Sequence, residues 1–379
     1  NSKHGPARSV MLGPKLGCII LGSGGLVSQR FQQRLCHHPF FELRGVVGSP
    51  NSVGKNLLDL PWHLDEKRPS LPDITIIGMK EGREFVMKND IQIVFSALPS
   101  EIAAESEPLF VKSGCMVYSN ASYYRMLNEV PLVIPEVNSN HLEILDSSEL
   151  GIVCSTNCTV MPVALSIKPI YDLLDIKNIS IQTEQSVSGG GLELLIATRL
   201  GNTPSPSIPG EAQKIEQELI RLLSDFEKDE ETKPEFGVSV SCKRVNRDFG
   251  HIVHIEIESN SNVKKEHIIE HWMNSSPSIC NNLPSSPIPH IIVKESIDLD
   301  KDRWAGATNK NLDPAENLHA GMAIVTTIPE ISGNIVKWSA FSENTIRGAA
   351  GGCILLAELD SMRRGIIPLS SSGEGYNPL

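Results

Sequence analysis

Cys158 combines a reactive side chain with a position that would activate it. It follows the segment GIVCSTN and opens an apolar stretch, 158–174, that predicts a helix. A thiol at the N-terminus of a helix faces the positive end of the helix dipole, which lowers its pKa. A thiolate is a good nucleophile toward an acyl carbon. The position therefore predicts acyl-transfer chemistry at Cys158, with a small buried hydrophobe as the alternative for any single cysteine.

A thiol nucleophile needs a partner that can give or take a proton. His251 ends the segment RVNRDFGH and begins a stretch of alternating polarity, 251–259, that predicts a strand. His254 lies three residues further along the same stretch. Imidazole is the usual acid or base in such sites, but residue type and position do not distinguish the two histidines.

A glycine-rich turn near the start of the chain has the local context of a dinucleotide site. The segment LGSGGLVSQRF follows an apolar run and precedes a predicted helix, 25–36. Gly22, Gly24 and Gly25 would let the backbone approach a pyrophosphate at the helix N-terminus. Val27 stands where the third glycine of G-x-G-x-x-G would fall, so an ordinary strand-to-helix turn is the alternative.

The loop after the second predicted strand favours NADP over NAD. That strand, 41–48, ends at Gly48 and no Asp or Glu follows to bind the ribose 2′-hydroxyl of NAD. The loop SPNSVGK instead offers Ser49, Ser52 and Lys55, which suit a 2′-phosphate. A solvated loop with Lys55 in water is the alternative.

The elements that must position these residues fall into two groups. Apolar runs alternate with helical patterns in the first group, which predicts a parallel, doubly wound α/β sheet. Its strands are expected at 15–22, 41–48, 91–98, 116–120 and 132–137, and its helices at 25–36 and 101–113.

The pattern changes after residue 157. Long strands with few helices predict a mixed or antiparallel sheet that is covered on one face. A last helix, 344–363, is rich in small residues and is expected to pack back on the first group. In this second group, helices are expected at 158–174 and 210–224, and strands at 179–189, 238–245, 251–259, 291–296, 321–328 and 334–341.

Composition excludes several classes of protein. The 379 residues suffice for two domains, and a net charge of -11 argues against nucleic-acid binding. Eight dispersed cysteines without a CxxC pair indicate reduced thiols in a cytoplasmic compartment and no zinc site. No apolar run reaches the roughly 20 residues of a membrane span. The polar segment 1–14 is expected to be a disordered leader, which leaves organellar import open.

Short motifs in a fixed order resemble those of the aspartate-semialdehyde dehydrogenase family, in its archaeal and fungal branch. The resemblance extends from about Lys15 to about Leu359. Several ordered matches are more specific than any single one. The motifs are LGSGGLVSQRF, VFSALPS, SNASYYRM, VPLVIPEVN, STNC, SVSG, GEAQKIE, RVNRDFGH and NTIRGAAG.

The resemblance implies a catalytic set. Cys158 is the expected nucleophile, His251 the acid and base, and Gln185 the residue that orients the acyl intermediate. It thereby selects His251 over His254.

The resemblance also implies how ligands are held. Arg244 is expected to bind the substrate carboxylate, Glu211 the amino group, and Lys214 and Arg125 the phosphate, with Asn157 beside the nucleophile. No metal ion is expected. The residues expected to contact NADP are Gly22, Ser23, Gly24, Gly25, Leu26, Val27, Ser49, Ser52, Lys55, Ser96, Ser188, Gly189 and Asn344.

The chain departs from the family pattern at several places. The turn before the nucleophile reads S-T-N-C where the family usually has N-P-N-C, so Thr156 replaces a proline. The segment GGLELLIATRLGNTPSPS replaces one usually rich in glycine and proline, and Asn51 stands where arginine is common. The segment 303–319 differs from the commoner short form.

The expected protein is a two-domain α/β enzyme. A Rossmann-type NADP-binding domain would comprise 15–157 and 345–379, and 158–344 would form an α+β catalytic and dimerisation domain with a large mixed sheet. The resemblance implies NADPH-dependent reduction of β-aspartyl phosphate through a Cys158 thioester, in lysine, threonine and methionine biosynthesis. It also implies a homodimer or dimer-based tetramer.

Besides an N-acetyl-glutamyl-phosphate reductase, against which the spacing of Arg244 and His251 argues, two alternatives remain at this point. The first is a related reductase of an acyl-CoA thioester such as malonyl-CoA, against which Glu211 argues because a malonyl group has no amino group. The second is a non-catalytic NADP-binding protein, against which the presence of Cys158, His251 and Gln185 argues.

Overall fold

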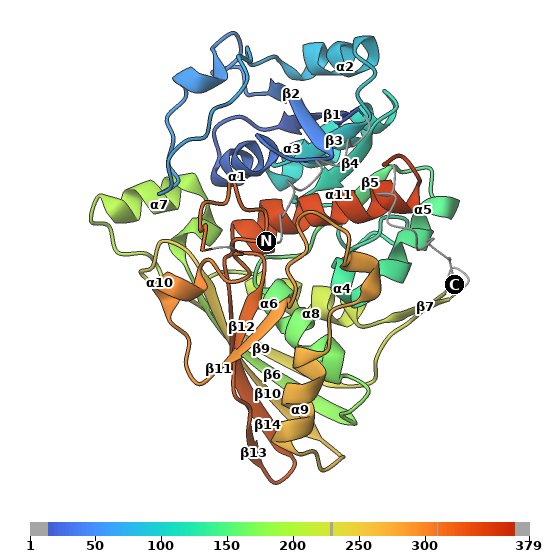
Figure 1. Cartoon of the computed structure of the whole chain (residues 1–379), viewed down its shortest axis with the longest axis vertical. Helices are drawn as coiled ribbons and strands as arrows, with labels where there is room; N and C mark the ends of the chain where they lie inside the picture. The colour runs from blue at the N-terminus through green and yellow to red at the C-terminus, as the bar shows by residue number, and fades with distance from the viewer. Residues whose placement is uncertain (1–13, 228–229, 309, 368–379) are drawn as a thin grey trace, which may run out of the picture.

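Two sheets lie one above the other in the structure, with a long helix between them (Figure 1). The computed structural model describes residues 14–227, 230–308 and 310–367. Of the predicted leader 1–14, only Pro14 falls within the described residues. At the other end of the chain, the described residues extend to Ile367. The α/β fold class expected from the sequence is confirmed.

The first sheet is fully parallel, with the strand order β2-β1-β3-β4-β5. Most residues of its strands are apolar and buried because helices cover both faces of the sheet, whereas Glu42 and Arg44 of the edge strand β2 are exposed. The strands are β1 (Leu16–Leu21), β2 (Phe41–Val47), β3 (Ile93–Ser96), β4 (Met116–Ser119) and β5 (Ile152–Cys154), and the larger helices among them are α1 (Leu26–Leu35), α2 (Met79–Lys88) and α3 (Ser100–Val111).

The second sheet is mixed, as predicted, with the order β11-β12-β14-β10-β6-β9 and β13 beside β14. The pairs β6–β9 and β11–β12 are parallel, and β10 pairs antiparallel with β6 and β14. The strands are β6 (Ile176–Gln185), β9 (Gly237–Arg244), β10 (His251–Ser259), β11 (Ile291–Lys294), β12 (Ile324–Thr327), β13 (Glu330–Ser332) and β14 (Ile335–Ser342).

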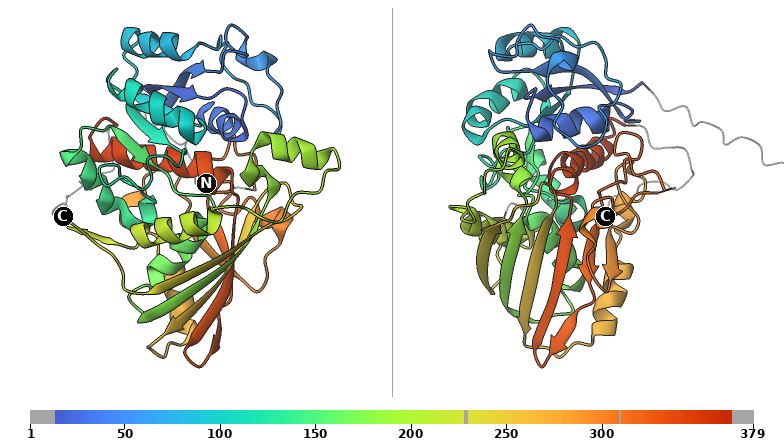
Figure 2. Two further views of the ribbon diagram at one scale, coloured as in Figure 1. Left: turned by 180° about the vertical axis from the view of Figure 1, so that it is seen from behind. Right: turned by 90° about the vertical axis from the view of Figure 1, so that its left-hand side faces the viewer.

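Helices cover one face of this second sheet. They are α6 (Val160–Ile167), α8 (Glu211–Leu222) and α9 (Lys265–Met273), and their apolar sides join one core with the inward residues of β6, β10 and β14. Trp272 and Trp338 meet edge to face in this core, and both indole N–H groups donate to Ser166. Among the described residues, no helix covers the opposite face of the sheet (Figure 2).

The C-terminal segment returns to the first sheet, as predicted. A π-helical turn, Ile346–Ala350, with a kink at Ala349 precedes α11 (Gly351–Arg363). The apolar side of α11 packs with residues of β1, β3 and α1, including Ile20 and Phe31. The segment after β14 therefore connects the two sheets (Figure 1).

One predicted strand is wrong, and one predicted helix is too long. Residues 132–137 are not a strand: Leu132 forms only an isolated bridge to Cys154, and Pro135 starts the short helix α4 because proline lacks an N–H for a strand ladder. The helix predicted at 158–174 begins at Val160 and ends at Ile167, since Pro169 cannot donate the next helical hydrogen bond.

The remaining elements are short. They are α4 (Pro135–Asn138), α5 (Ile144–Ser147), α7 (Leu192–Arg199), α10 (Leu299–Asp302), β7 (Asp225–Glu227) and β8 (Glu230–Thr232). Within the described ranges, no helix has the length and apolar character needed to cross a membrane.

Candidate functional site

Cys158 and His251 meet between α6 and β10. Cys158 Sγ lies 3.2 Å from His251 Nε2. His251 is the first residue of β10 and is fully buried, whereas His254 is exposed on the uncovered face and bonds Ser339. The alternation of strand side chains thus separates the two histidines, and only His251 faces the cysteine.

The surroundings keep both partners neutral. Burial, followed by the negative charge of Glu211, raises the pKa of the Cys158 thiol to about 12, against the opposing charges of Arg125 and Arg244. Burial, followed by Arg244 and Arg247, lowers the pKa of His251 to about 3. The predicted lowering of the Cys158 pKa by a helix N-terminus is therefore wrong here, because α6 starts two residues later and burial of the sulfur dominates.

Asn157 is held beside the nucleophile by α8. Its Nδ2 donates to Glu211 Oε1 at 2.9 Å, and its Oδ1 accepts the backbone N–H of Thr159 at 2.7 Å. Gln185 Nε2 lies 3.4 Å from the same Glu211 oxygen. The structure therefore brings three of the predicted residues around Cys158.

Arg244 ends β9 and lies next to His251. Its Nη1 donates to the Ser186 carbonyl at 2.8 Å. A Cβ atom on Gly189 would lie 2.9 Å from His251 Cε1 and 3.0 Å from Arg244 Nη1, so only glycine lets the SVSG turn approach both side chains.

Arg125 and Lys214 differ in how they are placed. Arg125 is buried, and its Nη1 and Nη2 donate to Glu218 Oε1 and to the Asn120 carbonyl. Its Nε is buried without a hydrogen-bond partner among the described residues. Lys214 is exposed on α8, one turn after Glu211. Arg125 thus offers a fixed charge, and Lys214 offers a movable one.

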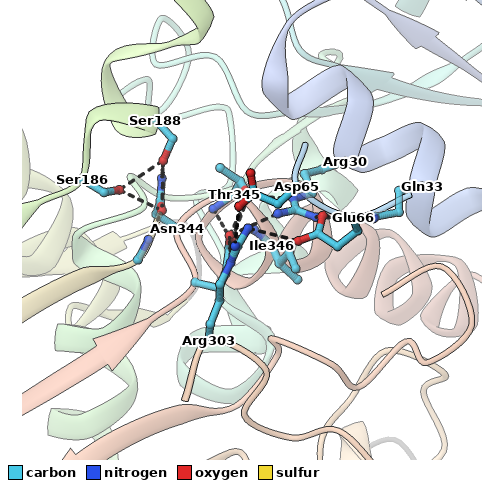
Figure 3. A network of polar contacts seen from close by, with 12 residues as sticks. Arg30, Gln33, Asp65, Glu66, Ser186, Ser188, Arg303, Asn344, Thr345 and Ile346 are labelled. Carbon is cyan, nitrogen blue, oxygen red and sulfur yellow. Dashed lines mark hydrogen bonds and ion pairs between the residues drawn. The ribbon is translucent and has the colours of Figure 1, made fainter. Parts of the chain in front are cut away.

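Asn344 binds the SVSG turn. Its Oδ1 accepts the Gly250 N–H at 2.7 Å and the Ser186 hydroxyl at 3.1 Å, and its Nδ2 donates to Ser188 Oγ at 3.0 Å (Figure 3). These contacts fix Ser188 and Asn344 on the same side of the site as His251.

A charged network, which we call the Arg30–Arg303 network, adjoins Asn344 and consists of Arg30, Asp65, Glu66, Arg303 and Glu343. Arg30, on α1, pairs with Glu66 at 2.6 Å and with Glu343 at 3.3 Å. Arg303 pairs with Asp65 at 2.8 Å and with Glu66 at 3.1 Å. Figure 3 shows Arg30, Asp65, Glu66 and Arg303 converging beside Thr345. The helix after the glycine turn is thereby tied to the residue that precedes Asn344.

The glycine turn has the free space that a dinucleotide pyrophosphate needs. Gly22 has a φ of +103°, which favours glycine, and a Cβ on Gly25 would meet nothing within 4 Å. No side chain caps the start of α1 among the described residues, so its N–H groups face that space. Leu26 packs below the turn, Val27 is half-buried in α1, and Ser96 ends β3 nearby on the sheet.

The loop after β2 leaves no room at the strand end for the Asp or Glu that would bind the ribose 2′-hydroxyl of NAD. Ser23 Oγ and Ser52 Oγ lie 3.1 Å apart, and Ser52 also donates to the Ser49 carbonyl. A Cβ on Gly48 would lie 2.3 Å from Ser52 Oγ and 2.5 Å from Ile76 Cγ2, so this strand end has no room for Asp or Glu. Lys55 is exposed. These residues fit NADP better than NAD.

Sequence reasoning missed three residues that touch this set. The Ser186 N–H donates to His251 Nδ1, Glu218 accepts the Asn157 N–H, and a Cβ on Gly348 would lie 2.7 Å from Cys158 Cβ. Glu218 stands seven residues after Glu211, a spacing that places both on one helix face and that the sequence displays. Gly348 lies in the small-residue run of the last helix, but nothing in that run indicates Cys158 as its neighbour.

In the described part of the chain, no three His, Cys, Asp or Glu side chains lie close enough together to hold a metal ion.

Comparisons with known proteins find aspartate-semialdehyde dehydrogenases and a malonyl CoA reductase among the relatives of this chain. Residues 18–145 match the family described as semialdehyde dehydrogenase, NAD binding domain. An aspartate-semialdehyde dehydrogenase of Archaeoglobus fulgidus is 35% identical over 352 residues, which cover 90% of this chain and 96% of the relative. A malonyl CoA reductase (NADP) of Metallosphaera sedula is 28% identical, over 91% of this chain and 96% of the relative.

A solved structure is also similar over almost its whole length. The aspartate semialdehyde dehydrogenase of Candida albicans, crystallised with NADP, superposes with a TM-score of 0.77 at 27% identity. The match covers 93% of this chain and 100% of the other.

Proposed function

The chain belongs to the aspartate-semialdehyde dehydrogenase family, and from this premise we propose that it reduces β-aspartyl phosphate to aspartate semialdehyde and phosphate with NADPH. The observation that carries the proposal is the Cys158–His251 pair at 3.2 Å, with Glu211, Gln185 and Arg244 around it. A partly buried thiol next to an imidazole and an arginine is suited to covalent acyl transfer.

Cys158 forms a covalent thioester in the first half of this reaction. Its sulfur attacks the acyl carbon, the bond to phosphate breaks, and the thiol proton leaves with the phosphate. NADPH, when bound, supplies the hydride that reduces the thioester. The oxygen of the reduced thioester takes up one proton from solvent to give a thiohemiacetal. As the carbon–sulfur bond breaks, His251 transfers that proton from the oxygen to the departing sulfur, so the aldehyde forms and the Cys158 thiol is restored.

The other side chains hold the substrate in this proposal. Arg244 binds the α-carboxylate through a charge-assisted contact, and Glu211 accepts from the amino group. Gln185 orients the acyl carbonyl. Arg125 and Lys214 provide the positive charge that stabilises the departing phosphate. The fixed placement of Arg125 supports a role in transition-state stabilisation, which requires groups that need no rearrangement.

NADP is held by the first sheet in this proposal. The pyrophosphate would lie on Gly24, Gly25 and the start of α1, and the 2′-phosphate beside Ser52 and Lys55. Ser188, Gly189 and Asn344 would border the nicotinamide on the side of Cys158. Ser23, Ser49, Ser96, Leu26 and Val27 would complete the pocket.

The test is a coupled measurement in the reverse direction. Aspartate semialdehyde, NADP and inorganic phosphate are mixed with the protein, and NADPH absorbance is followed. We expect turnover that requires phosphate and that Cys158→Ala abolishes. Cys36→Ala is the matched control, because Cys36 contacts the Gln33 carbonyl far from the site and should leave turnover unchanged. NADP binding without turnover would contradict the proposal.

Reduction of an acyl-CoA thioester is the second candidate, favoured by the similarity to the Metallosphaera sedula reductase. The two activities use the same cysteine but differ at the amino group that Glu211 would meet. Replacing phosphate by coenzyme A, and aspartate semialdehyde by malonyl semialdehyde, distinguishes them. NADPH production only with coenzyme A and malonyl semialdehyde would transfer the assignment to this second activity.

Self-association is a further part of the proposal. Figure 2 shows the helix-free face of the second sheet. Gln182, His254 and Ser339 lie on strands of this sheet, and their side chains are exposed or partly exposed. We expect two copies to pair through this face and a homodimer or tetramer to sediment. Gln182→Arg together with Ser339→Arg would produce monomers by charge repulsion.

All eight cysteines are free, which supports a cytoplasmic location.

A further inference from the structure

Helix α8 accepts two hydrogen bonds from Asn157, the residue before the nucleophile. Glu211, its first residue, accepts from the Asn157 side chain at 2.9 Å, and Glu218 Oε2 accepts the Asn157 backbone N–H at 2.6 Å. Seven residues are almost two helical turns, so both carboxylates project from one face of α8. Glu211 is part of the predicted substrate site, whereas Glu218 has no role assigned to it so far.

Glu218 contacts both the turn before the nucleophile and Arg125. Its Oε2 also accepts the Thr156 hydroxyl at 2.8 Å, and its Oε1 accepts Arg125 Nη1 at 3.0 Å. The Glu218 side chain is only 3% exposed. A buried carboxylate is stable when it is paired and fully hydrogen-bonded, and Arg125 together with the two donors of the turn meets that condition.

Thr156 is one of the positions where the chain departs from the family pattern. Proline at this place fixes φ and restricts the turn without any tertiary contact. Threonine has no such restriction, but its hydroxyl is anchored on Glu218. The backbone N–H of the next residue is anchored on the same oxygen, so two consecutive residues before Cys158 are restrained together.

We propose that Glu218 is a positioning residue that fixes the Thr156–Asn157 turn and Arg125 relative to each other. The Thr156–Glu218 hydrogen bond then restrains the turn in place of the absent proline. Glu218 acts through these neighbours and not on the substrate itself. The inference rests on the proposed function only for the choice of assay. It predicts that removal of one hydroxyl misplaces the sulfur, although Thr156 belongs to neither the catalytic nor the ligand-binding set.

The decisive variants are at Thr156, because they leave the buried Glu218–Arg125 ion pair in place. Thr156→Val removes the hydroxyl at nearly constant shape, and we expect kcat to fall by about tenfold or more while KM for aspartate semialdehyde changes less than about twofold. Thr156→Ser keeps the hydroxyl and should retain most of kcat. Thr156→Pro restores the covalent restraint and should recover most of the loss.

A matched control separates this effect from the general cost of the substitution. Thr326 is a buried threonine on β12 whose hydroxyl has no hydrogen-bond partner among the described residues. Thr326→Val is the same chemical change away from the turn and should leave kcat unaltered. In a double-mutant cycle, Thr156→Val should add little to the loss in Glu218→Gln, because Glu218→Gln already removes the charge to which the Thr156 hydroxyl donates.

Alkylation of Cys158 by iodoacetamide provides a readout that needs no substrate. We expect the pH profile of this rate to change in Thr156→Val and to return to the wild-type profile in Thr156→Pro. Absence of turnover in the wild type would overturn the proposed function but leave this comparison valid. A Thr156→Val protein with wild-type kcat and alkylation profile, or a Thr156→Pro protein no better than Thr156→Val, would overturn the role of Glu218.

Discussion

The backbone N–H of Ser186 donates to Nδ1 of His251 at 3.1 Å, and this contact fixes which ring nitrogen carries the proton. The Ser186 hydroxyl lies 3.2 Å from the same nitrogen and can take either role, but an amide can only donate. Nδ1 is therefore an acceptor, and the proton of the neutral ring is on Nε2, facing Cys158. In this tautomer His251 donates a hydrogen bond to the sulfur.

This contact predicts an NMR signature for His251. Nδ1 should show the nitrogen shift of an unprotonated imidazole nitrogen and should not titrate between about pH 5 and 9, because the pKa is lowered to about 3. Ser186→Ala keeps the amide and should keep the tautomer. Ser186→Pro removes the amide at a φ of −66°, which suits proline, and should shift the tautomer. A protonated Nδ1 in the wild type would contradict the assignment.

Glu211 raises the pKa of Cys158, and its removal should separate thiol reactivity from turnover. With a pKa of about 12, the rate of Cys158 alkylation should rise about tenfold per pH unit from pH 7 to 10 without reaching a plateau. Glu211→Gln removes a negative charge, so alkylation at any given pH should be faster, while turnover should fall because the amino group loses its partner. Mass spectrometry of the labelled cysteine measures the first quantity.

Glu193→Gln is the control for this comparison, because Glu193 is exposed on α7 and should change neither rate. Slower alkylation in Glu211→Gln would show that Glu211 holds the thiol in place and does not act through its charge.

Gly348 packs against the nucleophile, and any side chain there should displace it. A Cβ would lie 2.7 Å from Cys158 Cβ and 3.0 Å from its Cα, distances that no rotamer change can relieve. We expect Gly348→Ala to lower kcat by about tenfold or more and the free energy of unfolding by about 1–3 kcal/mol. Steady-state kinetics and chemical denaturation measure the two effects. Wild-type kcat in this variant would show that the π-helical turn moves without cost.

Glu107 makes stability depend on pH. It lies on α3, and its Oε1 accepts the Ser119 hydroxyl at 2.6 Å, but burial raises its pKa from 4.5 to about 7. Between these values the unfolded chain loses the proton while the folded protein keeps it, so stability falls as pH rises and levels off above pH 7. The free energy of unfolding should decrease by about 3 kcal/mol across this window because of this residue.

Denaturation of Glu107→Gln at pH 5 and pH 8 tests this dependence. The variant should lose that part of the decrease, and Glu105→Gln, an exposed position on the same helix, should not. Equal pH dependence in the Glu107→Gln variant and the wild type would contradict the buried-carboxyl explanation.

The first sheet could be predicted because buried parallel strands read as continuous apolar runs, such as Leu16–Leu21. The run around 132–137 is equally apolar but forms no strand, since the proline within it starts a helix. Helix α7 went unrecognised because glycines precede it and its apolar residues give no clear helical stripe; Leu195 packs on the separate cluster of Leu26 and Phe249. Local patterns record the propensity of a segment but not its packing partner.

The residues of the site likewise divide into those that local motifs predict and those that only tertiary packing brings together. Cys158 and His251 are recognisable by type and motif, although 93 positions separate them. The contacts of Glu218 with the 156–157 turn and of Gly348 with Cys158 arise from tertiary packing, which one sequence does not display. The direction of the Cys158 pKa shift was likewise beyond prediction, since it depends on how deeply the sulfur is buried.

The Arg30–Arg303 network limits how this enzyme can be recombined with its relatives. Arg30, Asp65 and Glu66 belong to the part of the chain that carries the glycine turn, whereas Arg303 and Glu343 come from the part that carries His251. A chimera that exchanged only the N-terminal part would bury charges from one parent without their partners from the other. The part of the chain that carries the glycine turn therefore cannot be exchanged alone, and a successful exchange must transfer both sides of this network.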